Sequence, residues 1–193
     1  IKKYLVYIYK SMKDITDLTL PEIQGIIRFE KTSVNKHYNV LIYRNIMLEP
    51  IVPYLTYELL SIGLNSSVII GEYDNILQET ILNLKDNLNT KTNLVLVFMQ
   101  METLSPALCN DILKLTSEEL ENEVNRIEEY IQSVIENIRN TSDAPILFYG
   151  FPNPVYRKLG IHENQKGFEL SIYQRLNNFI RSFNDISVFI VDA

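Results

Sequence analysis

The amino-acid sequence predicts an α/β fold, a three-layer α/β/α sandwich around a five-stranded, mostly parallel sheet. Five short apolar segments rich in β-branched residues alternate with segments of helical periodicity. The segments between them are long enough for the helical crossovers that parallel strands require. Residues 93–99 are apolar on both faces, as a central parallel strand is. The strand order most often seen for this pattern is 2-1-3-4-5.

Residues 1–38 are predicted to be a helical N-terminal extension and linker, ahead of an α/β domain over residues 39–193. The periodicity of residues 1–14 does not decide between helix and strand. Residues 20–30 predict a helix, because Thr19 can cap it and Pro21 stands in its first turn. The chain begins at Ile1 and stops at the end of a predicted strand, so we expect a fragment of a longer multidomain protein.

The first half of the α/β domain alternates strand and helix twice. Residues 39–43 and 67–70 predict the first two strands. Between them, Pro50 opens a helix that Gly63 is placed to end. A second helix is predicted over residues 75–84, with Asp74 as an N-cap candidate.

The second half continues the same alternation. Residues 93–99 predict the third strand and 106–115 a short helix. Thr116 and Glu119 form a capping box for the longest helix, whose apolar stripe favours packing on a sheet over a coiled coil. The remaining elements are a strand within 143–149, a loop at 151–154, a helix with apolar positions from 168 to 183, and a strand at 187–191.

Composition and motifs exclude several kinds of function. The net charge of −6 over 193 residues argues against binding to nucleic acid or to an anionic membrane. The one cysteine, Cys109, forms no internal disulfide, which favours a cytoplasmic location, and it is predicted to be a small buried apolar residue. The sequence has no zinc-type Cys/His spacing, no glycine-rich phosphate loop and no GxSxG elbow, so we expect no metal or nucleotide cofactor in this segment.

Ligands of such sheets bind beyond the carboxyl ends of the strands, near the point where the strand order reverses. The loops at that edge therefore supply the candidate ligand-binding residues, which are Arg44, Asn45, Glu49, Gly71, Tyr73, Gln100, Asn153, Arg157 and His162.

Two interpretations stay open for most of these side chains. Arg44 either binds an anion such as phosphate, or forms a salt bridge with Glu49 or Glu72. Asn45 and Gln100 either orient a polar ligand or satisfy the main chain of their loops.

Several short motifs resemble the N-terminal domain of FkbH-like proteins, subfamily IIIC of the haloacid dehalogenase superfamily. They are residues 44–50, residues 57–60 with Gly63, residues 71–74, and the pair Gln78 and Glu79. The resemblance covers about residues 39–193 and implies an SGNH-hydrolase-like, flavodoxin-like fold. It also implies a following phosphatase-like domain with a DxDxT motif and magnesium. This chain has no such motif, so magnesium is expected only in that missing domain.

The catalytic blocks of SGNH hydrolases are replaced in this sequence. Arg44-Asn45-Ile46 stands where the family has Gly-Asp-Ser, and isoleucine cannot act as a nucleophile. Gly71 matches the family's glycine after strand 2, whose N–H serves an oxyanion hole. Gln100-Met101-Glu102 replaces the Gly-x-Asn-Asp block. We therefore predict no catalytic residue and no SGNH-type hydrolysis.

The leading hypothesis is an accessory, non-catalytic domain in polyketide, nonribosomal peptide or polysaccharide biosynthesis. It would position an acyl carrier protein, or a phosphopantetheine-linked acyl or glyceryl unit, for the phosphatase-like domain, with Arg44, Arg157 and Lys158 near the phosphate. One alternative is an esterase or acyltransferase with a non-standard site that uses Asn45, Glu49, Glu102 or His162. His162 is otherwise a solvated loop histidine. Another alternative is a dimerisation domain.

Overall fold

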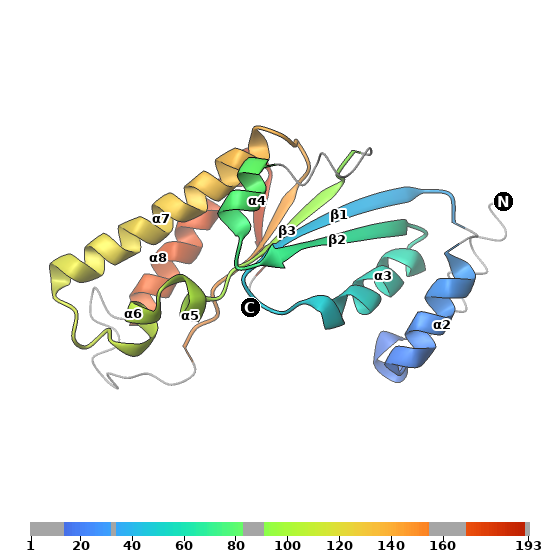
Figure 1. The fold of residues 1–193 in the computed structure, drawn as a ribbon, viewed down its shortest axis with the longest axis horizontal. Coiled ribbons are helices and arrows are strands. Elements are labelled where there is room, and N and C mark those ends of the chain that lie inside the picture. Colours follow the sequence, from blue (N-terminus) through green and yellow to red (C-terminus); the bar gives the residue numbers. More distant parts are fainter. Residues whose placement is uncertain (1–13, 32–33, 83–90, 155–168, 192–193) are drawn as a thin grey trace.

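The computed structural model of the chain describes residues 14–31, 34–82, 91–154 and 169–191. It contains one parallel sheet with strand order β2-β1-β3-β4-β5 (Figure 1). This confirms the predicted fold class and strand order. The strands are β1 His37–Arg44, β2 Asn65–Tyr73, β3 Leu94–Phe98, β4 Ile146–Tyr149 and β5 Val188–Val191.

Helices cover the two faces of the sheet and complete the three layers (Figure 1). On one face, α3 packs against side chains of β1 and β2 such as Ile42 and Val68. The opposite faces of β1, β3 and β4 form the larger core with the helices that follow α3 in the chain. The helices are α2 Leu20–Glu30, α3 Val52–Ser61, α4 Ile76–Leu82, α5 Met101–Leu104, α6 Pro106–Asn110, α7 Ser117–Arg139 and α8 Glu169–Arg181, with 3-10 turns η1 Ile15–Asp17, η2 Glu49–Ile51 and η5 Asn184–Ile186.

The helix α2 has the bounds that the sequence predicts, and its capping box joins Thr19 to Glu22. Ile23 is fully buried, and α2 packs against α3 (Figure 1). Strand β1 begins at His37, two residues earlier than predicted, because His37 and Tyr38 pair with the start of β2. Most of the predicted segment 1–14 lies outside the described residues.

Two other elements also differ in extent from the predictions. Strand β2 extends beyond the predicted 67–70 at both ends, because its pairing with β1 continues through polar residues and past a bulge to Arg44 and Tyr73. The predicted helix 106–115 ends at Asn110, and a short helix, α5, precedes it. Ser105 separates the two helices, since its hydroxyl caps α6 by accepting the N–H of Leu108 at 3.2 Å.

The long helix α7 lies on the sheet, as its apolar stripe predicts. The predicted capping box joins Thr116 and Glu119, and the buried residues of α7 belong to the larger core. Arg175 ties α8 to this helix through ion pairs with Glu121 and Glu128, both at 2.8 Å. Within the described part of the chain, no helix combines the length and apolarity that a membrane crossing needs.

Candidate functional site

A cavity of about 760 Å³, here termed the strand-end cavity, lies beyond the carboxyl ends of β1, β3 and β4. The strand order reverses between β1 and β3, so the cavity stands where ligands of this architecture bind. Its described lining consists of Ile46, Met99, Gln100, Met101, Glu102, Cys109, Asn110, Tyr149, Pro152, Asn153, Pro154, Glu169 and Tyr173.

The structure brings only some of the predicted site residues to this cavity. Gln100 and Asn153 line it. Asn45 lies behind the wall and bonds to Gln100, as described below. The described lining does not include the other predicted residues from the β1 and β2 loops, Arg44, Glu49, Gly71 and Tyr73. The last two predicted site residues, Arg157 and His162, lie outside the described part of the chain.

The side chain of Asn45 satisfies the main chain of a neighbouring loop. Its Oδ1 accepts the N–H of Gln100 at 2.7 Å, and its Nδ2 donates to the Gln100 carbonyl at 3.2 Å. Asn45 is only 2% exposed. The contacts of Asn45 therefore match the second interpretation, in which it satisfies the main chain of a loop. Through Gln100, Asn45 fixes the edge of the strand-end cavity.

The guanidinium of Arg44 forms a two-pronged ion pair with Glu49, at 2.8 Å from Nη1 to Oε2 and 2.6 Å from Nη2 to Oε1. Its remaining contacts are donations to the carbonyls of Gly71 and Ile46, both at 3.1 Å. Arg44 thus joins the loop after β1 to the end of β2. These contacts match the salt-bridge interpretation, with Glu49 rather than Glu72 as the partner. The pKa of Glu49 is lowered by its own N–H and by Arg44.

Glu79, which the sequence reasoning did not assign to the site, fills the space beside Gly71. Its Oε1 accepts the N–H of Glu72 at 2.8 Å, and a Cβ on residue 71 would overlap its Oε2. The carboxyl group is buried, and burial raises its pKa. Burial and the nearby Glu79 also raise the pKa of Tyr43 to about 12. Gly71 is thus required for close packing, while Tyr73 at the end of β2 is exposed.

Helices α6 and α8 contribute polar groups to the cavity that sequence reasoning did not find. Cys109 is partly exposed on the cavity wall rather than buried, and its Sγ lies 3.7 Å from the hydroxyl of Tyr173. Burial, with Cys109, Glu169 and Glu102 nearby, raises the pKa of Tyr173, so the phenol stays protonated. Glu169 and Tyr173 are one helical turn apart at the start of α8, a spacing that places them on one face.

The chemistry of the lining favours a neutral, largely apolar ligand. Ile46, Met99, Met101 and Tyr149 supply apolar surface, and methionine adapts to irregular shapes. The charged residues of the described lining are both carboxylates, which disfavour an anion at this position. Among the described residues, no group of three or more His, Cys, Asp and Glu side chains is placed to hold a metal ion.

No family model matches this chain, and no curated protein matches it. One similar solved structure is the N-terminal part of the protein BF1531 from Bacteroides fragilis, described as containing a phosphatase domain complexed with Mg. The two chains share a TM-score of 0.70 and 11% identity over 91% of this chain and 45% of that one. An acetyl xylan esterase, AlAXEase, gives a TM-score of 0.47 and 13% identity, over 80% of this chain and 76% of the esterase.

At 11% identity, the likeness to the BF1531 structure is a likeness of fold. It extends over nearly all of this chain, which spans less than half the length of that solved chain. The overall fold, which in this chain is an α/β sandwich with strand order 2-1-3-4-5, is therefore what this protein shares with that structure.

Proposed function

We propose that this chain is a non-catalytic domain that holds the acyl or glyceryl end of a phosphopantetheine-linked unit in the strand-end cavity. In this proposal it belongs with the N-terminal domains of FkbH-like proteins and presents the unit to a following phosphatase-like domain. The fold likeness to the BF1531 structure supports this arrangement, because that structure is described as containing a phosphatase domain.

The observation that carries the proposal is the place of Ile46 on the cavity wall. It is the second residue after the end of β1, and the sequence resemblance aligns it with the nucleophilic serine of SGNH hydrolases. An aliphatic side chain there cannot attack a carbonyl carbon, but it can pack against an acyl chain. In this proposal the cavity corresponds to the hydrolase site that the resemblance implies, and it offers a binding surface instead of a nucleophile.

The size and lining of the cavity fit the end of a pantetheine arm. A volume of about 760 Å³ lies within the range of small-molecule sites. Gln100 and Asn153 offer amide groups for the polar amides of the arm, while Met99 and Met101 offer apolar contact. Since Arg44 is paired with Glu49, the arm's phosphate would meet Arg157 or Lys158, and that assignment stays a prediction.

The test is a calorimetric titration of the 193-residue chain with butyryl-pantetheine and with pantetheine. We expect the acyl form to bind more tightly, because only that form fills the apolar part of the cavity. Ile46→Trp should fill the cavity and weaken binding at least roughly tenfold. Met47→Trp is the matched control, because Met47 is adjacent in sequence, 80% exposed and not part of the described lining.

Equal binding by Ile46→Trp and the wild type would reject the cavity as the acyl site. A carrier protein loaded with the same butyryl arm extends the test to the natural partner class. If it binds only as tightly as the free thioester, the chain recognises the arm and not the carrier.

The esterase or acyltransferase alternative has one observation in its favour, the Cys109 thiol on the cavity wall next to Tyr173. Tyr173 stays protonated and so does not act as the base that a thiol nucleophile needs. Asn45 and Glu49 are committed to Gln100 and Arg44. If the chain hydrolyses a thioester and Cys109→Ala or His162→Ala abolishes that activity, the chain is an enzyme and the binding proposal is overturned.

A further inference from the structure

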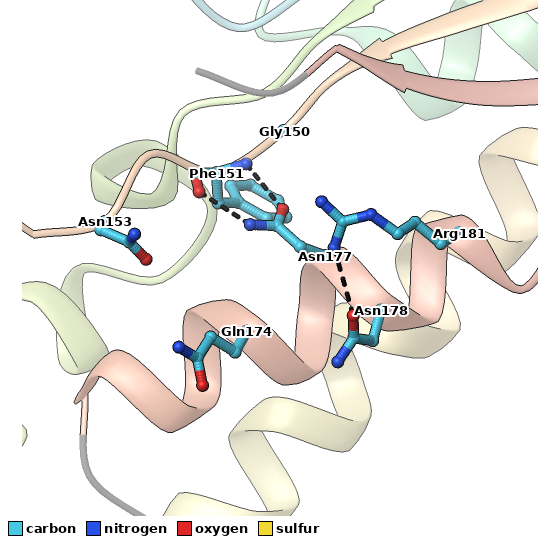
Figure 2. Close-up of a pocket in the computed structure, with 7 residues that line it drawn as sticks. All are labelled: Gly150, Phe151, Asn153, Gln174, Asn177, Asn178 and Arg181. Atoms are coloured by element: carbon cyan, nitrogen blue, oxygen red, sulfur yellow. Dashed lines mark hydrogen bonds between the residues drawn. The ribbon is translucent and has the colours of Figure 1, made fainter. Parts of the chain in front are cut away.

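A second hollow, here termed the amide groove, lies between α8 and the loop that follows β4 (Figure 2). Its volume is about 350 Å³. The α8 wall carries polar side chains at the spacing i, i+3, i+4, i+7, which places them on one helical face. The lining is Gly150, Phe151 and Asn153 from the loop, with Gln174, Asn177, Asn178 and Arg181 from α8.

The back of the amide groove is held in place by Asn177. Its Oδ1 accepts the N–H of Phe151 and its Nδ2 donates to the Phe151 carbonyl, both at 2.9 Å (Figure 2). Gly150 packs closely on β5, since a Cβ there would stand 3.0 Å from Ile190 Cδ1. The loop wall is therefore fixed on α8 before any ligand arrives.

The orientation of Asn178 is also determined. Nη1 of Arg181 lies 3.1 Å from Oδ1 of Asn178 (Figure 2). Because a guanidinium only donates hydrogen bonds, the oxygen of Asn178 must face Arg181. The amide NH2 of Asn178 therefore points away from Arg181 (Figure 2). Gln174, one turn earlier, and Asn153, on the loop wall, are exposed carboxamides of the same groove.

Carboxamides can bind hydroxyl groups by two hydrogen bonds at once. Each one presents an NH2 donor and a carbonyl acceptor side by side, and each hydroxyl of a vicinal diol both donates and accepts. An apolar ligand would leave the amides without partners, at a cost in desolvation. The described lining contains no carboxylate, so these residues do not suit a divalent cation.

We propose that the amide groove binds a small, neutral, polyhydroxylated molecule of about the size of one sugar ring, since the volume lies at the lower end of small-molecule sites. Gln174, Asn178 and Asn153 make the ligand hydrogen bonds, and Asn177 and Gly150 position the wall. The two sites share Asn153, but Gln174 and Asn178 are part of the described lining of the amide groove alone, so variants at these two residues test this site separately from the proposed acyl site.

The experiment is a 1H–15N NMR titration of the 193-residue chain with glucose, galactose and mannose in turn. At least one sugar should cause saturable shifts in the side-chain NH2 signals of Gln174 and Asn178 and in the backbone N–H of Phe151. The double variant Gln174→Ala/Asn178→Ala should weaken binding roughly tenfold, because it removes several ligand hydrogen bonds. Gln132→Ala, an exposed amide on α7, should leave the affinity unchanged.

A second variant protects the test against misfolding. Gln174→Glu keeps the side-chain length at an exposed position but removes the NH2 donor, so it should also weaken binding. Absence of saturable shifts with all three sugars would overturn the proposal. The proposal would also be overturned if the double variant and Gln174→Glu both bound the sugar as tightly as the wild type.

Discussion

Asn45 holds Gln100 by both ends of its carboxamide, and Asn177 holds Phe151 in the same way. Gln100 and Phe151 lie just beyond the ends of their strands, where no neighbouring strand in the described part of the chain pairs with their main chain. In each pair the asparagine side chain supplies those two hydrogen bonds instead. The first pair joins the loops after β1 and β3, and the second joins the loop after β4 to α8. The two asparagines thus fix the edges of the strand-end cavity and the amide groove.

Asn45→Ala is predicted to destabilise the fold by about 1–3 kcal/mol, because it leaves the N–H and carbonyl of Gln100 without their partner. Urea unfolding followed by circular dichroism measures the loss. Asn110→Ala removes an exposed amide that also lines the cavity, and should leave the unfolding midpoint nearly unchanged. Similar midpoints for the two variants would show that the Asn45 bonds contribute little.

Gly71→Ala should destabilise the protein by about 1–3 kcal/mol, since the new Cβ overlaps the buried carboxyl group of Glu79 and lies 3.2 Å from the Ile42 carbonyl. Gly25 supplies the opposite case on an exposed part of α2, where nothing lies within 4 Å of an added Cβ. Gly25→Ala should therefore stabilise by about 0.5–1 kcal/mol. Thermal unfolding of both variants checks the sign of each change.

Hydrophobic periodicity predicts the sheet, because β1 and β3 place apolar side chains in the cores on both faces and β4 places them in the larger core. It fails at element ends. The extra residues of β2 are polar and are held by pairing with β1, and hydrophobicity does not register main-chain hydrogen bonds. The helix α5 has four residues, too few to show a period.

The site is predictable only where it is made of strand-end loops. Gln100 and Asn153 lie in the loops that follow β3 and β4, so the topology alone places them at the cavity. Cys109 and Tyr173 come from helices, and their meeting depends on how α6 and α8 pack. The choice of Glu49 as the partner of Arg44 depends on the η2 turn, which no pattern in the sequence predicts.

The Arg44–Glu49 pair should make stability depend on pH in the acidic range. The pKa of Glu49 is lowered in the folded state, so its contribution is present above the unfolded value of about 4.3 and is lost as pH falls through the folded value. Glu49→Gln lacks this titration. The stability difference between wild type and Glu49→Gln should therefore shrink between pH 7 and pH 3 in urea unfolding. The exposed Glu129→Gln is the control, and a difference that stays constant contradicts the pair's role.

Glu79 should show the opposite dependence on pH. Its pKa is raised by burial, and Glu72 raises it further, whereas the Glu72 N–H and Arg44 act in the other direction. The folded state therefore holds the proton more tightly, and stability declines as pH rises from the unfolded pKa of about 4.3 through the folded value.

Glu79→Gln keeps an oxygen for the Glu72 N–H without the charge. Its stability relative to wild type should rise from pH 4 to a plateau at higher pH, as measured by urea midpoints. A difference that does not change over that range would mean that Glu79 is ionised in the fold at no cost, with Arg44 compensating for its burial.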